Sequence, residues 1–330
     1  MVVLSEQNAI AYLSKRCPLW QPIGIPVSLG GGVSNTVLLL ETAAGRVVLK
    51  QALAKLRVAQ DWFSDPARTL REAKGLSVAS AFLPKGQIPR LLFLDETNLI
   101  YAMEAAPPES MDWKQFLLAG IVNQDTADTV GSILGSLIAA SWRDAALELE
   151  FGDQTVFGQL RLDPYYRATA NKHPDLGNFF ESLIRSSGER KLSLVHGDWS
   201  PKNLLICGAN VMAVDFEVIH FGDASFDAGF LLNHLMLKSF HRPELTAALE
   251  SASLGFYQHL ETHLPESHGE FQDFTIRHWA ALMLARVDGK SPVEYISSEE
   301  ARQNIRQFAR QMILHPPKDI FQFWSERRKA

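Results

Sequence analysis

The spacing of apolar residues changes once along this chain, near Ala105, and this change limits the possible fold more than any other feature. Before it, from Pro26 to Gln51, short extended runs alternate with glycine-containing turns, as in an antiparallel hairpin system. After it, apolar residues recur at helical spacing, as from Val130 to Ile138. We therefore predict an α+β protein with two lobes, a small antiparallel-sheet lobe at residues 1–105 and a larger, mainly helical lobe at residues 106–330.

Local patterns predict further elements in both lobes. Asp65 followed by Pro66 predicts the N-cap and first residue of a helix that carries Glu72. The runs IPRLLFLD and NLIYAMEA predict two strands, and the hinge between the lobes is expected at residues 106–108, Ala-Pro-Pro. In the second lobe, Asp125 is expected to cap the first helix. Four further helices are predicted there, at Phe226 to Phe240, Leu245 to His263, Asp273 to Val287 and Glu299 to Leu314.

Composition excludes several classes of protein. The chain has 330 residues, 46% of them hydrophobic, and a formal net charge of -5, so we expect a folded protein that does not bind nucleic acid. Cys17 and Cys207 are too few for a disulfide framework or a four-cysteine metal site, which favours a reducing, cytoplasmic location. No stretch reaches about 18 uninterrupted apolar residues and no export signal is recognisable, so we expect no membrane partner.

The segment from His196 to Glu217 has the strongest chemical pattern. HGDWSPKN places Asp198 and Asn203 in a polar loop, and two β-rich runs, NLLIC and VMAVDF, follow it around a turn. If the end of the second run stays extended, its two-residue period puts the carboxylates of Asp215 and Glu217 on one side. Hard oxygen ligands of this kind suit Mg²⁺, and the Asp198 carboxylate would remain to accept a proton from an attacking hydroxyl.

This pattern resembles the aminoglycoside phosphotransferase and choline kinase family, which has a bilobal protein-kinase-like fold. In that family H-x-D-x-x-x-x-N supplies a catalytic base and a metal ligand, and a following D-x-E or D-x-D supplies the main metal ligands. The resemblance implies that Asp198 is the base, that Asn203 and Asp215 hold Mg²⁺, and that Glu217 is a further metal contact. It also implies that Asp227, in FGDASFDAGFLLNHL, braces the catalytic loop through hydrogen bonds.

The alternative for this segment is a β-hairpin whose polar residues serve as caps and turns. Either motif alone is common by chance, but here both are present, flanked by strands, and Asp198 and Asp215 are 17 residues apart. The combination therefore favours the catalytic interpretation.

The first lobe is then expected to bind ATP. In the loop GGGVSN, backbone N–H groups of Gly31 and Gly32 and the side chains of Ser34 and Asn35 could approach phosphates, as the glycine-rich loop of kinases does. A glycine hairpin without a ligand is the alternative. By the same resemblance, the strand LIYAMEAAP would offer backbone groups from Met103 to Ala105 to adenine.

Lys50 strengthens the nucleotide interpretation. It ends the apolar strand VVLK and needs an anionic partner if it faces inward. Kinases pair such a lysine with ATP phosphates and with a helix glutamate, and Glu72 follows 22 residues later. The alternative is an edge-strand lysine that points to water.

Two residues are candidates for the acceptor side. Trp199, inside the HGD loop, is expected to form a wall of the substrate pocket. Arg286, in ARVDGKSPVEYI, resembles an R-x-x-G pattern of the methylthioribose kinase branch, in which an arginine approaches substrate or phosphate. An arginine that favours the C-terminal end of a helix dipole is the alternative. Residues 106–330 hold 29 acidic and 21 basic side chains, which gives weak support to a polycationic acceptor.

The acceptor class follows from what the chain lacks relative to protein kinases. Only 12 residues separate Asp215 from Asp227, which leaves no room for a peptide-binding activation segment. We therefore predict an ATP- and Mg²⁺-dependent phosphotransferase that moves the γ-phosphate to a hydroxyl of a sugar, an amino alcohol or an aminoglycoside-like molecule. The alternatives are a nucleotide-binding pseudokinase, which would not need a base such as Asp198, and a protein kinase.

Overall fold

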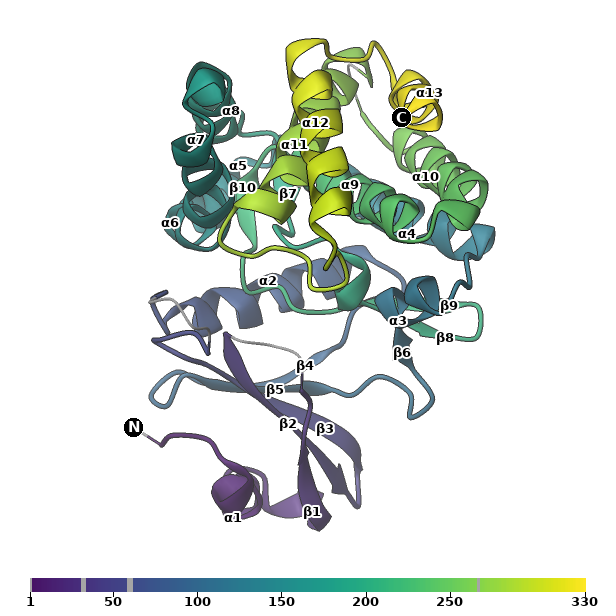
Figure 1. Ribbon diagram of the computed structural model, residues 1–330. Coiled ribbons are helices and arrows are strands. Elements are labelled where there is room, and N and C mark those ends of the chain that lie inside the picture. Colours follow the sequence, from purple (N-terminus) through teal and green to yellow (C-terminus); the bar gives the residue numbers. More distant parts are fainter. Residues whose placement is uncertain (1, 31–33, 58–61, 266–267) are drawn as a thin grey trace. The chain divides into compact units, whose positions relative to one another are not determined.

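The computed structural model describes residues 2–30, 34–57, 62–265 and 268–330, and the chain divides into two compact units (Figure 1). The first unit contains Met1–Glu109 together with Val214–Glu217, and the second contains Ser110–Ala213 and Val218–Ala330. The first is built on a sheet and the second mainly on helices, so the α+β class is confirmed. The lobe boundary after Ala105 stays a prediction.

The first unit is a five-stranded antiparallel sheet with helices. Its strands lie in the order β1-β2-β3-β5-β4. They are β1 (Pro22–Ser28), β2 (Asn35–Thr42), β3 (Gly45–Ala52), β4 (Leu91–Asp95) and β5 (Ile100–Glu104), and the helices are α1 (Glu6–Arg16), the short 3-10 helix η1 (Pro18–Trp20) and α2 (Arg68–Phe82). The strands β2 and β3 form a predicted hairpin, and β4 and β5 are the two later predicted strands. The helix α1 was not predicted.

The alternation of side chains along the strands decides what each face of this sheet carries. Leu38 and Leu40 of β2 and Val47 and Leu49 of β3 lie on one face and pack against α1. Lys50 is the next residue along β3, so its side chain lies on the opposite face. The helix α2 packs on that side of the sheet (Figure 1). An apolar face and a face with a buried charge therefore result from one strand pattern.

The helix α2 begins later than predicted. Asp65 was expected as its N-cap and Pro66 as its first residue, but the first helical residue is Arg68. The Asp65 carboxylate instead accepts a hydrogen bond of 2.9 Å from the Ala67 N–H, within a turn that precedes the helix. The guanidinium of Arg68 donates at 3.3 Å to the carbonyl oxygen of Ser64, so the first helical side chain is bonded to the backbone before the helix.

The second unit is mainly helical. Its α-helices are α3 (Trp113–Leu118), α4 (Gln124–Ala140), α5 (Ala145–Phe151), α6 (Thr155–Phe157), α7 (Ala168–Lys172), α8 (Gly177–Glu189), α9 (Ser225–His241), α10 (Thr246–Glu261), α11 (His268–Asp288), α12 (Glu299–Leu314) and α13 (Ile320–Lys329). Shorter helical segments are the π-helix η2 (Gly158–Arg167) and the 3-10 helices η3 (Pro174–Leu176), η4 (Pro201–Asn203) and η5 (Pro243–Leu245). The four late helices correspond to α9, α10, α11 and α12.

Short strands in this unit form two small sheets. One pairs β7 (Ser193–Val195) with β10 (His220–Gly222), and the other has the order β6-β8-β9, with β6 (Met111–Asp112), β8 (Leu204–Cys207) and β9 (Asn210–Ala213). The predicted run NLLIC thus contains β8, whereas only the first three residues of VMAVDF lie in β9. The loop that contains HGDWS lies between β7 and η4.

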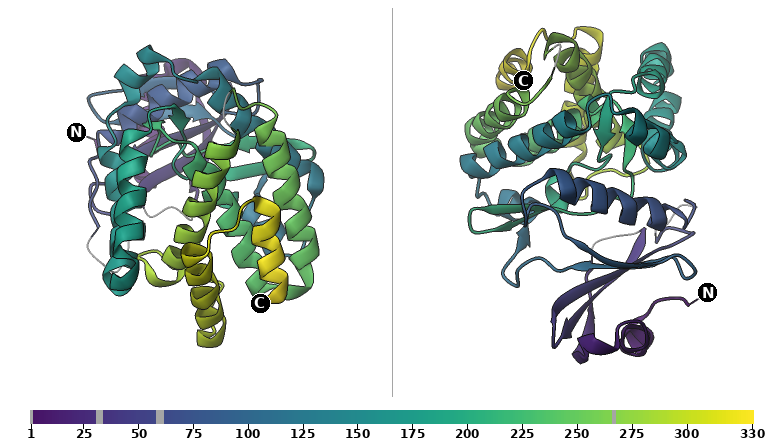
Figure 2. Two further views of the ribbon diagram at one scale, coloured as in Figure 1. Left: turned by 90° about the horizontal axis from the view of Figure 1, so that it is seen from above. Right: turned by 180° about the vertical axis from the view of Figure 1, so that it is seen from behind.

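Close helix packing makes the core of the second unit. Almost all residues of α9 are buried, and α10 and α11 pack against it. The helices α4 and α10 lie side by side (Figure 2), and a Cβ atom added to Gly131 would lie 2.1 Å from the carbonyl oxygen of Phe256. The cap of α4 is Asn123, which accepts from the Thr126 N–H, and not Asp125 as predicted. None of the helices in the described ranges is long and apolar enough to cross a membrane.

Candidate active site

A buried lysine with two carboxylates is the main polar feature of the first unit. Lys50 on β3 donates to Glu72 on α2 over 2.6 Å and also to Asp215, in the returning segment Val214–Glu217. The side chains of Lys50 and Glu72 are 4% and 2% exposed, whereas that of Asp215 is 21% exposed. The predicted pairing of Lys50 with Glu72 is confirmed, and a lysine that points to water is excluded.

Burial and ion pairing act in opposite directions on the pKa values of this cluster. Burial raises the pKa of Glu72 to about 7, although the Lys50 ammonium opposes the rise. Burial alone would lower the pKa of Lys50, but the carboxylates of Asp215 and Glu72 outweigh it and hold that pKa well above its usual value. Lys50 is therefore a fixed positive charge at neutral pH.

The chain turns sharply at Asp215. The strand β9 ends at Ala213, and Asp215 has a φ of 70°, a left-handed conformation that few non-glycine residues adopt. The expectation that an extended strand would put Asp215 and Glu217 on one side is therefore wrong. The left-handed turn instead accompanies the contact of Asp215 with Lys50, and Glu217 has other partners.

Three side chains hold the carboxylate of Glu217. Ser34 donates to Oε1 over 2.8 Å, Asn35 donates to Oε2 over 2.8 Å, and Arg68 donates to Oε2 over 3.3 Å. The buried guanidinium of Arg68 also donates to the carbonyl oxygen of Ser34 over 2.6 Å. Ser34 and Asn35 were predicted to approach phosphates, and in this structure they donate to a carboxylate. Arg68 was not predicted, because no local pattern links it to a glutamate 149 residues away.

The oxygen donors fit Mg²⁺ better at Asp215 than at Glu217. Within the described ranges, no three His, Cys, Asp or Glu side chains gather as a metal site. Mg²⁺ needs only one or two protein carboxylates, because water and phosphate oxygens complete its shell. Asp215 offers a partly exposed carboxylate in the first unit. In the second unit, Asn203 donates from its amide nitrogen to Asp198, and an amide oxygen is a ligand type that suits Mg²⁺. Both oxygens of Glu217 already accept hydrogen bonds.

In the second unit, one oxygen of the Asp198 carboxylate is held by three donors. Its Oδ2 atom lies 3.0 Å from Nη2 of Arg161, 3.0 Å from Nζ of Lys202 and 2.9 Å from Nδ2 of Asn203. The Asn203 amide also donates to the backbone oxygen of Asp198 over 2.9 Å. Asp198 is 2% exposed. These contacts fix the carboxylate in one orientation, as a positioned base requires.

Arg161 and Lys202 were not singled out from the sequence. Arg161 lies in the π-helix η2, with its guanidinium carbon 5.8 Å from the ring centres of both Tyr165 and Phe230. No sequence pattern marks such a helix or its contact with Asp198. Lys202 could have been found, because it follows Asp198 by four residues across the single turn η4.

The backbone of the same loop is held by Asp227 and shaped by a glycine. Asp227, in the first turn of α9, accepts hydrogen bonds of 2.6 Å from the His196 N–H and 2.8 Å from the Gly197 N–H. The predicted brace is therefore confirmed. Gly197 has a φ of 78°, and an added Cβ would lie 2.7 Å from Cγ1 of Val218, so a larger residue does not fit. Its carbonyl oxygen accepts a 2.6 Å hydrogen bond from Arg161.

Asp227 gives the first testable prediction, a pH-dependent stability. Burial raises its pKa from 3.8 to about 7, although the two N–H donors oppose the rise. Between these values the folded state holds a proton that the unfolded chain has lost. The contribution of Asp227 to the free energy of unfolding is thus complete below about pH 4 and declines as the pH rises toward 7, by at most about 1.4 kcal/mol per pH unit.

Urea unfolding of the wild type and of Asp227→Asn over this pH range checks the prediction. The difference between the two free energies should shrink as the pH rises. Asp175→Asn is the control, because hydrogen bonding to Arg310 lowers the pKa of Asp175, so its contribution is lost only as the pH falls. Parallel pH profiles for the wild type and Asp227→Asn would contradict the prediction.

Two further predicted nucleotide contacts, Met103 and Ala105, lie in or next to the sheet of the first unit. Met103 is a buried residue of β5, and the Ala105 N–H donates to the carbonyl oxygen of Arg46 over 3.4 Å. Gly31 and Gly32 lie outside the described residues. Their contacts with a nucleotide stay predictions.

Trp199 and Arg286 have different surroundings in the second unit. Trp199 is 1% exposed and its ring centre lies 5.3 Å from that of His196, which argues for packing of the loop rather than for a pocket wall. Arg286, in the last turn of α11, donates to the backbone oxygen and hydroxyl of Ser291 and, over 3.3 Å, to the hydroxyl of Tyr165. Its Nε atom is buried and has no hydrogen-bond partner in the described structure.

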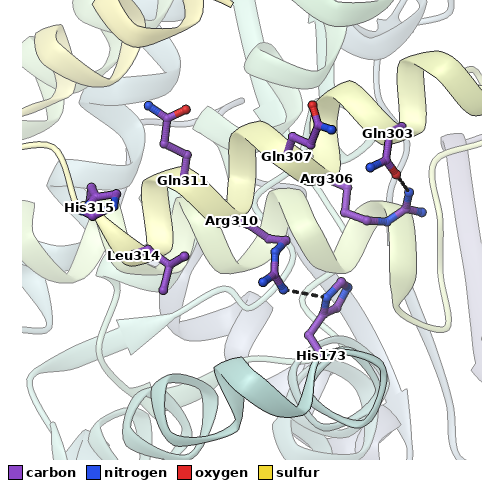
Figure 3. A pocket seen from close by; sticks show the side chains of 8 residues that line it. All are labelled: His173, Gln303, Arg306, Gln307, Arg310, Gln311, Leu314 and His315. Carbon is purple, nitrogen blue, oxygen red and sulfur yellow. Dashed lines mark hydrogen bonds between the residues drawn. The ribbon is translucent and has the colours of Figure 1, made fainter.

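A hollow of about 670 Å³ on the surface of α12 is lined by none of the predicted site residues (Figure 3). Its arginines already have partners. Arg306 donates to Asp288 over 2.7 and 2.8 Å, and Arg310 bonds Asp175 over 2.5 Å and His173 over 3.1 Å. This hollow therefore offers paired charges, and we do not assign it to the active site.

Comparison with known proteins tests the predicted family. A family model of the phosphotransferase enzyme family matches residues 27–253, which include the Lys50 strand, the loop of Asp198 and the bracing Asp227. The chain belongs to this family. Methylthioribose kinase 1 of Oryza sativa subsp. japonica is 25% identical to this family member over 276 residues, which cover 72% of the chain and 63% of the rice protein. The phosphotransferase chain thus matches less than two thirds of the length of this relative.

Solved structures confirm the protein-kinase-like fold of this phosphotransferase family member. An amicoumacin kinase in complex with AMP-PNP and Ca²⁺ has a TM-score of 0.62 at 12% identity, over 96% of this chain and 97% of that one. A choline/ethanolamine kinase family protein from Mesorhizobium loti has a TM-score of 0.57 at 15% identity, over 98% of this chain and 99% of that one. At these identities the likeness concerns the fold alone.

Proposed function

We propose that this phosphotransferase family member transfers the γ-phosphate of ATP to a hydroxyl group of a small molecule. The contact of Lys50 with both Glu72 and Asp215 supports this proposal most strongly. Kinases use a strand lysine paired with a helix glutamate to hold nucleotide phosphates, and an aspartate on a later segment to hold metal. The similarity to a methylthioribose kinase supports a small hydroxyl acceptor rather than a protein.

On the nucleotide side, we assign phosphate binding to Lys50, whose charge Glu72 maintains. Backbone groups of Gly31 and Gly32 would complete the contacts with the phosphates. We also assign Ser34 and Asn35 to phosphate binding. Their hydrogen bonds to the carboxylate of Glu217 give them a second role, that of positioning this glutamate. The strand segment from Met103 to Ala105 would bind adenine through its backbone.

On the metal side, Asn203 and Asp215 would hold Mg²⁺, which neutralises phosphate charge when it is bound. Glu217 is a further metal contact by family resemblance. Its three hydrogen-bond donors give it a second role, that of tying Arg68 to the segment that carries Asp215.

On the acceptor side, Asp198 would accept the proton of the attacking hydroxyl. A bond forms between the acceptor oxygen and the γ-phosphorus, the bond from that phosphorus to the ADP oxygen breaks, and the hydroxyl proton passes to the Asp198 carboxylate. Arg161, Lys202 and Asn203 keep this carboxylate oriented. Positioning and electrostatic stabilisation supply most of the rate in this type of reaction.

A screen for ADP release tests the proposal. Purified protein would be incubated with Mg²⁺, ATP and panels of sugars, amino alcohols, aminoglycosides and nucleosides, and background ATP hydrolysis would be subtracted. Release that depends on one small hydroxyl compound is the expected result. ATP binding without any acceptor-dependent release would favour a pseudokinase, and transfer to casein or a peptide library would favour a protein kinase.

Asp215→Asn gives a prediction for the metal site. The substitution keeps the size of the side chain and removes the charge that Mg²⁺ needs. Binding of Mg²⁺ with ATP should therefore weaken at least about 10-fold, because losing a residue that only holds a metal ligand already causes a loss of that size. Calorimetry with a non-hydrolysable ATP analogue, with and without Mg²⁺, measures this loss. Glu41→Gln, in an exposed ion pair of the same unit, is the control and should bind normally. Equal Mg²⁺ dependence in the wild type and Asp215→Asn would remove Asp215 from the metal site.

A further inference from the structure

Four cationic side chains from separate parts of the second unit act on the buried His234, and we call these five residues the basic cluster. They are Lys114 of α3, Lys202 of η4, His234 and Lys238 of α9, and Arg286 of α11. Burial, and after it the charges of the other four, lower the pKa of His234 well below its usual value. His234 is therefore neutral at pH 7, and its surroundings are positive although residues 106–330 have an excess of acidic groups.

One side of this cluster connects directly to the proposed base. Lys202 lies 3.0 Å from the carboxylate of Asp198. Arg161 bonds the same carboxylate and lies over the ring of Tyr165, and the Tyr165 hydroxyl accepts a hydrogen bond from Arg286. The guanidinium carbon of Arg286 is 5.6 Å from the centre of the Tyr165 ring. The ring of Tyr165 thus contacts both Arg161, which bonds the proposed base, and Arg286 of the basic cluster.

Arg161 also contacts a side chain of α9. Arg161 lies 5.8 Å from the ring centre of Phe230, and that ring centre is 5.3 Å from the one of His234. One turn further along α9, Lys238 donates to the carbonyl oxygen of His234 over 3.2 Å. The basic cluster therefore lies beside the proposed base, through the direct contact of Lys202 with Asp198 and through two aromatic contacts of Arg161.

Lys238 is a buried lysine that has no anionic partner among the described residues. It is 1% exposed, its ammonium lies 5.2 Å from the ring centre of Tyr295, and no carboxylate of the described residues is within ion-pair distance. The acidic groups that face it are Glu294, which is already bonded to a lysine of the basic cluster, and Asp112. Burial, followed by repulsion from the other cations, lowers the pKa of Lys238 to about 7.

Arg286 is half-buried and also lacks a carboxylate partner among the described residues. Its guanidinium donates only to neutral oxygens, those of Ser291 and Tyr165, and its buried Nε atom has no partner in the described structure. A buried positive charge that lacks an anion is costly for a folded protein. The buried Lys238 and the half-buried Arg286, both beside a proposed catalytic base, suggest that a ligand supplies the missing negative charge.

We propose that the acceptor carries an anionic group in addition to its hydroxyl, and that Lys238 and Arg286 bind this group. The inference rests on the proposed function and narrows its substrate class to hydroxy acids and phosphorylated polyols, since a carboxylate and a phosphate ester supply the same negative charge. A polycationic aminoglycoside would meet repulsion from the basic cluster.

Binding of small anions without nucleotide tests this inference. Glycerate, glycerol 3-phosphate and uncharged glycerol share a hydroxyl skeleton and differ in charge. At about 20 mM each, at least one of the two anions should raise the melting temperature clearly more than glycerol does. Glycerate alone would indicate a carboxylate, and glycerol 3-phosphate alone would indicate a phosphate ester. Equal shifts with all three compounds would overturn the inference.

Lys238→Met and the control Lys318→Met locate the site. Methionine retains an unbranched apolar stem, so Lys238→Met should stay folded but lose the anion-dependent shift, whereas Lys318→Met, at an exposed position of the same unit, should keep it. Equal shifts in the two variants would overturn the assignment to Lys238.

Proton uptake provides a second measurement that a structural role would not affect. An anion beside Lys238 should raise its pKa from about 7, so calorimetry near pH 8 in buffers of different ionisation heat should show up to one proton taken up per anion bound. Lys238→Met should show none, and uptake that persists in this variant would contradict the proposal. Because these assays contain no ATP, their failure would leave the kinase proposal intact, and a failed screen for ADP release would leave anion binding intact.

Discussion

Asp198→Asn should lower kcat by about 100- to 10,000-fold or more, with little change in the affinity for ATP. Asparagine can keep an oxygen in front of Arg161 and Lys202, so the loop should retain its conformation. Its amide cannot take the proton of an attacking hydroxyl. The substitution therefore removes the proposed chemistry and keeps the local packing. Steady-state kinetics on the acceptor found by the screen, together with calorimetry for an ATP analogue, measure the two quantities.

A matched control separates this effect from a general loss of stability. Asp175→Asn also neutralises one aspartate of an arginine pair in the second unit, but this pair lies at the surface near α12. Its kcat should equal that of the wild type. Turnover of Asp198→Asn within about tenfold of the wild type would remove Asp198 from the role of base.

The parts of the site that local patterns determine could be predicted from the sequence. A lysine at the end of an apolar strand must face one side of the sheet. The helix that follows the strand in the chain can bring a glutamate to that side. Lys50 and Glu72 meet in this way. The role of Asp227 was predicted from the family resemblance of the segment FGDASFDAGFLLNHL, and its contacts with the N–H groups of His196 and Gly197 agree with it.

The contacts that depend on tertiary structure could not be predicted. Arg161, which bonds Asp198, lies in the π-helix η2, and no spacing in the sequence marks that winding. Arg68 meets Glu217 because the segment 214–217 returns to the first unit after more than a hundred residues in the second. Such contacts are chosen by packing rather than by local propensity.

The backbone conformation of single residues could not be predicted from the sequence either. The pattern VMAVDFE reads as a continuous strand, but Asp215 adopts a left-handed conformation that strand periodicity does not reveal. The ion pair with Lys50 accompanies this conformation. The residue types of the candidate site were therefore predictable, whereas their orientation was not.

The charges in the first unit give a reason to expect a cation there. Lys50 and Arg68 contact three carboxylates, those of Glu72, Asp215 and Glu217. Negative charge therefore exceeds positive charge in this buried group, and the most exposed of the three carboxylates is Asp215. A divalent cation at Asp215 would offset the excess, whereas the basic cluster of the second unit has the opposite excess and suits an anion.

Lys50→Met should have the second large effect, a loss of ATP binding together with a loss of stability. The methylene stem of lysine is replaced by an apolar chain of similar length, but Glu72 loses its cation while its side chain is 2% exposed. Removing one partner of a buried ion pair typically costs about 3–5 kcal/mol. Urea unfolding should show a loss of this order, and calorimetry should show no measurable binding of an ATP analogue.

The double variant Lys50→Met/Glu72→Leu separates the two roles of the lysine. Replacing both members of a buried pair by apolar side chains of similar volume is often neutral for stability, so most of the lost free energy of unfolding should return. ATP binding should not return, because no positive charge is left to meet the phosphates. Asp215 also loses its contact with Lys50 in this variant. Its carboxylate is partly exposed, so water can still solvate the charge. A double variant that regains both stability and ATP affinity would show that Lys50 serves the fold and not the nucleotide.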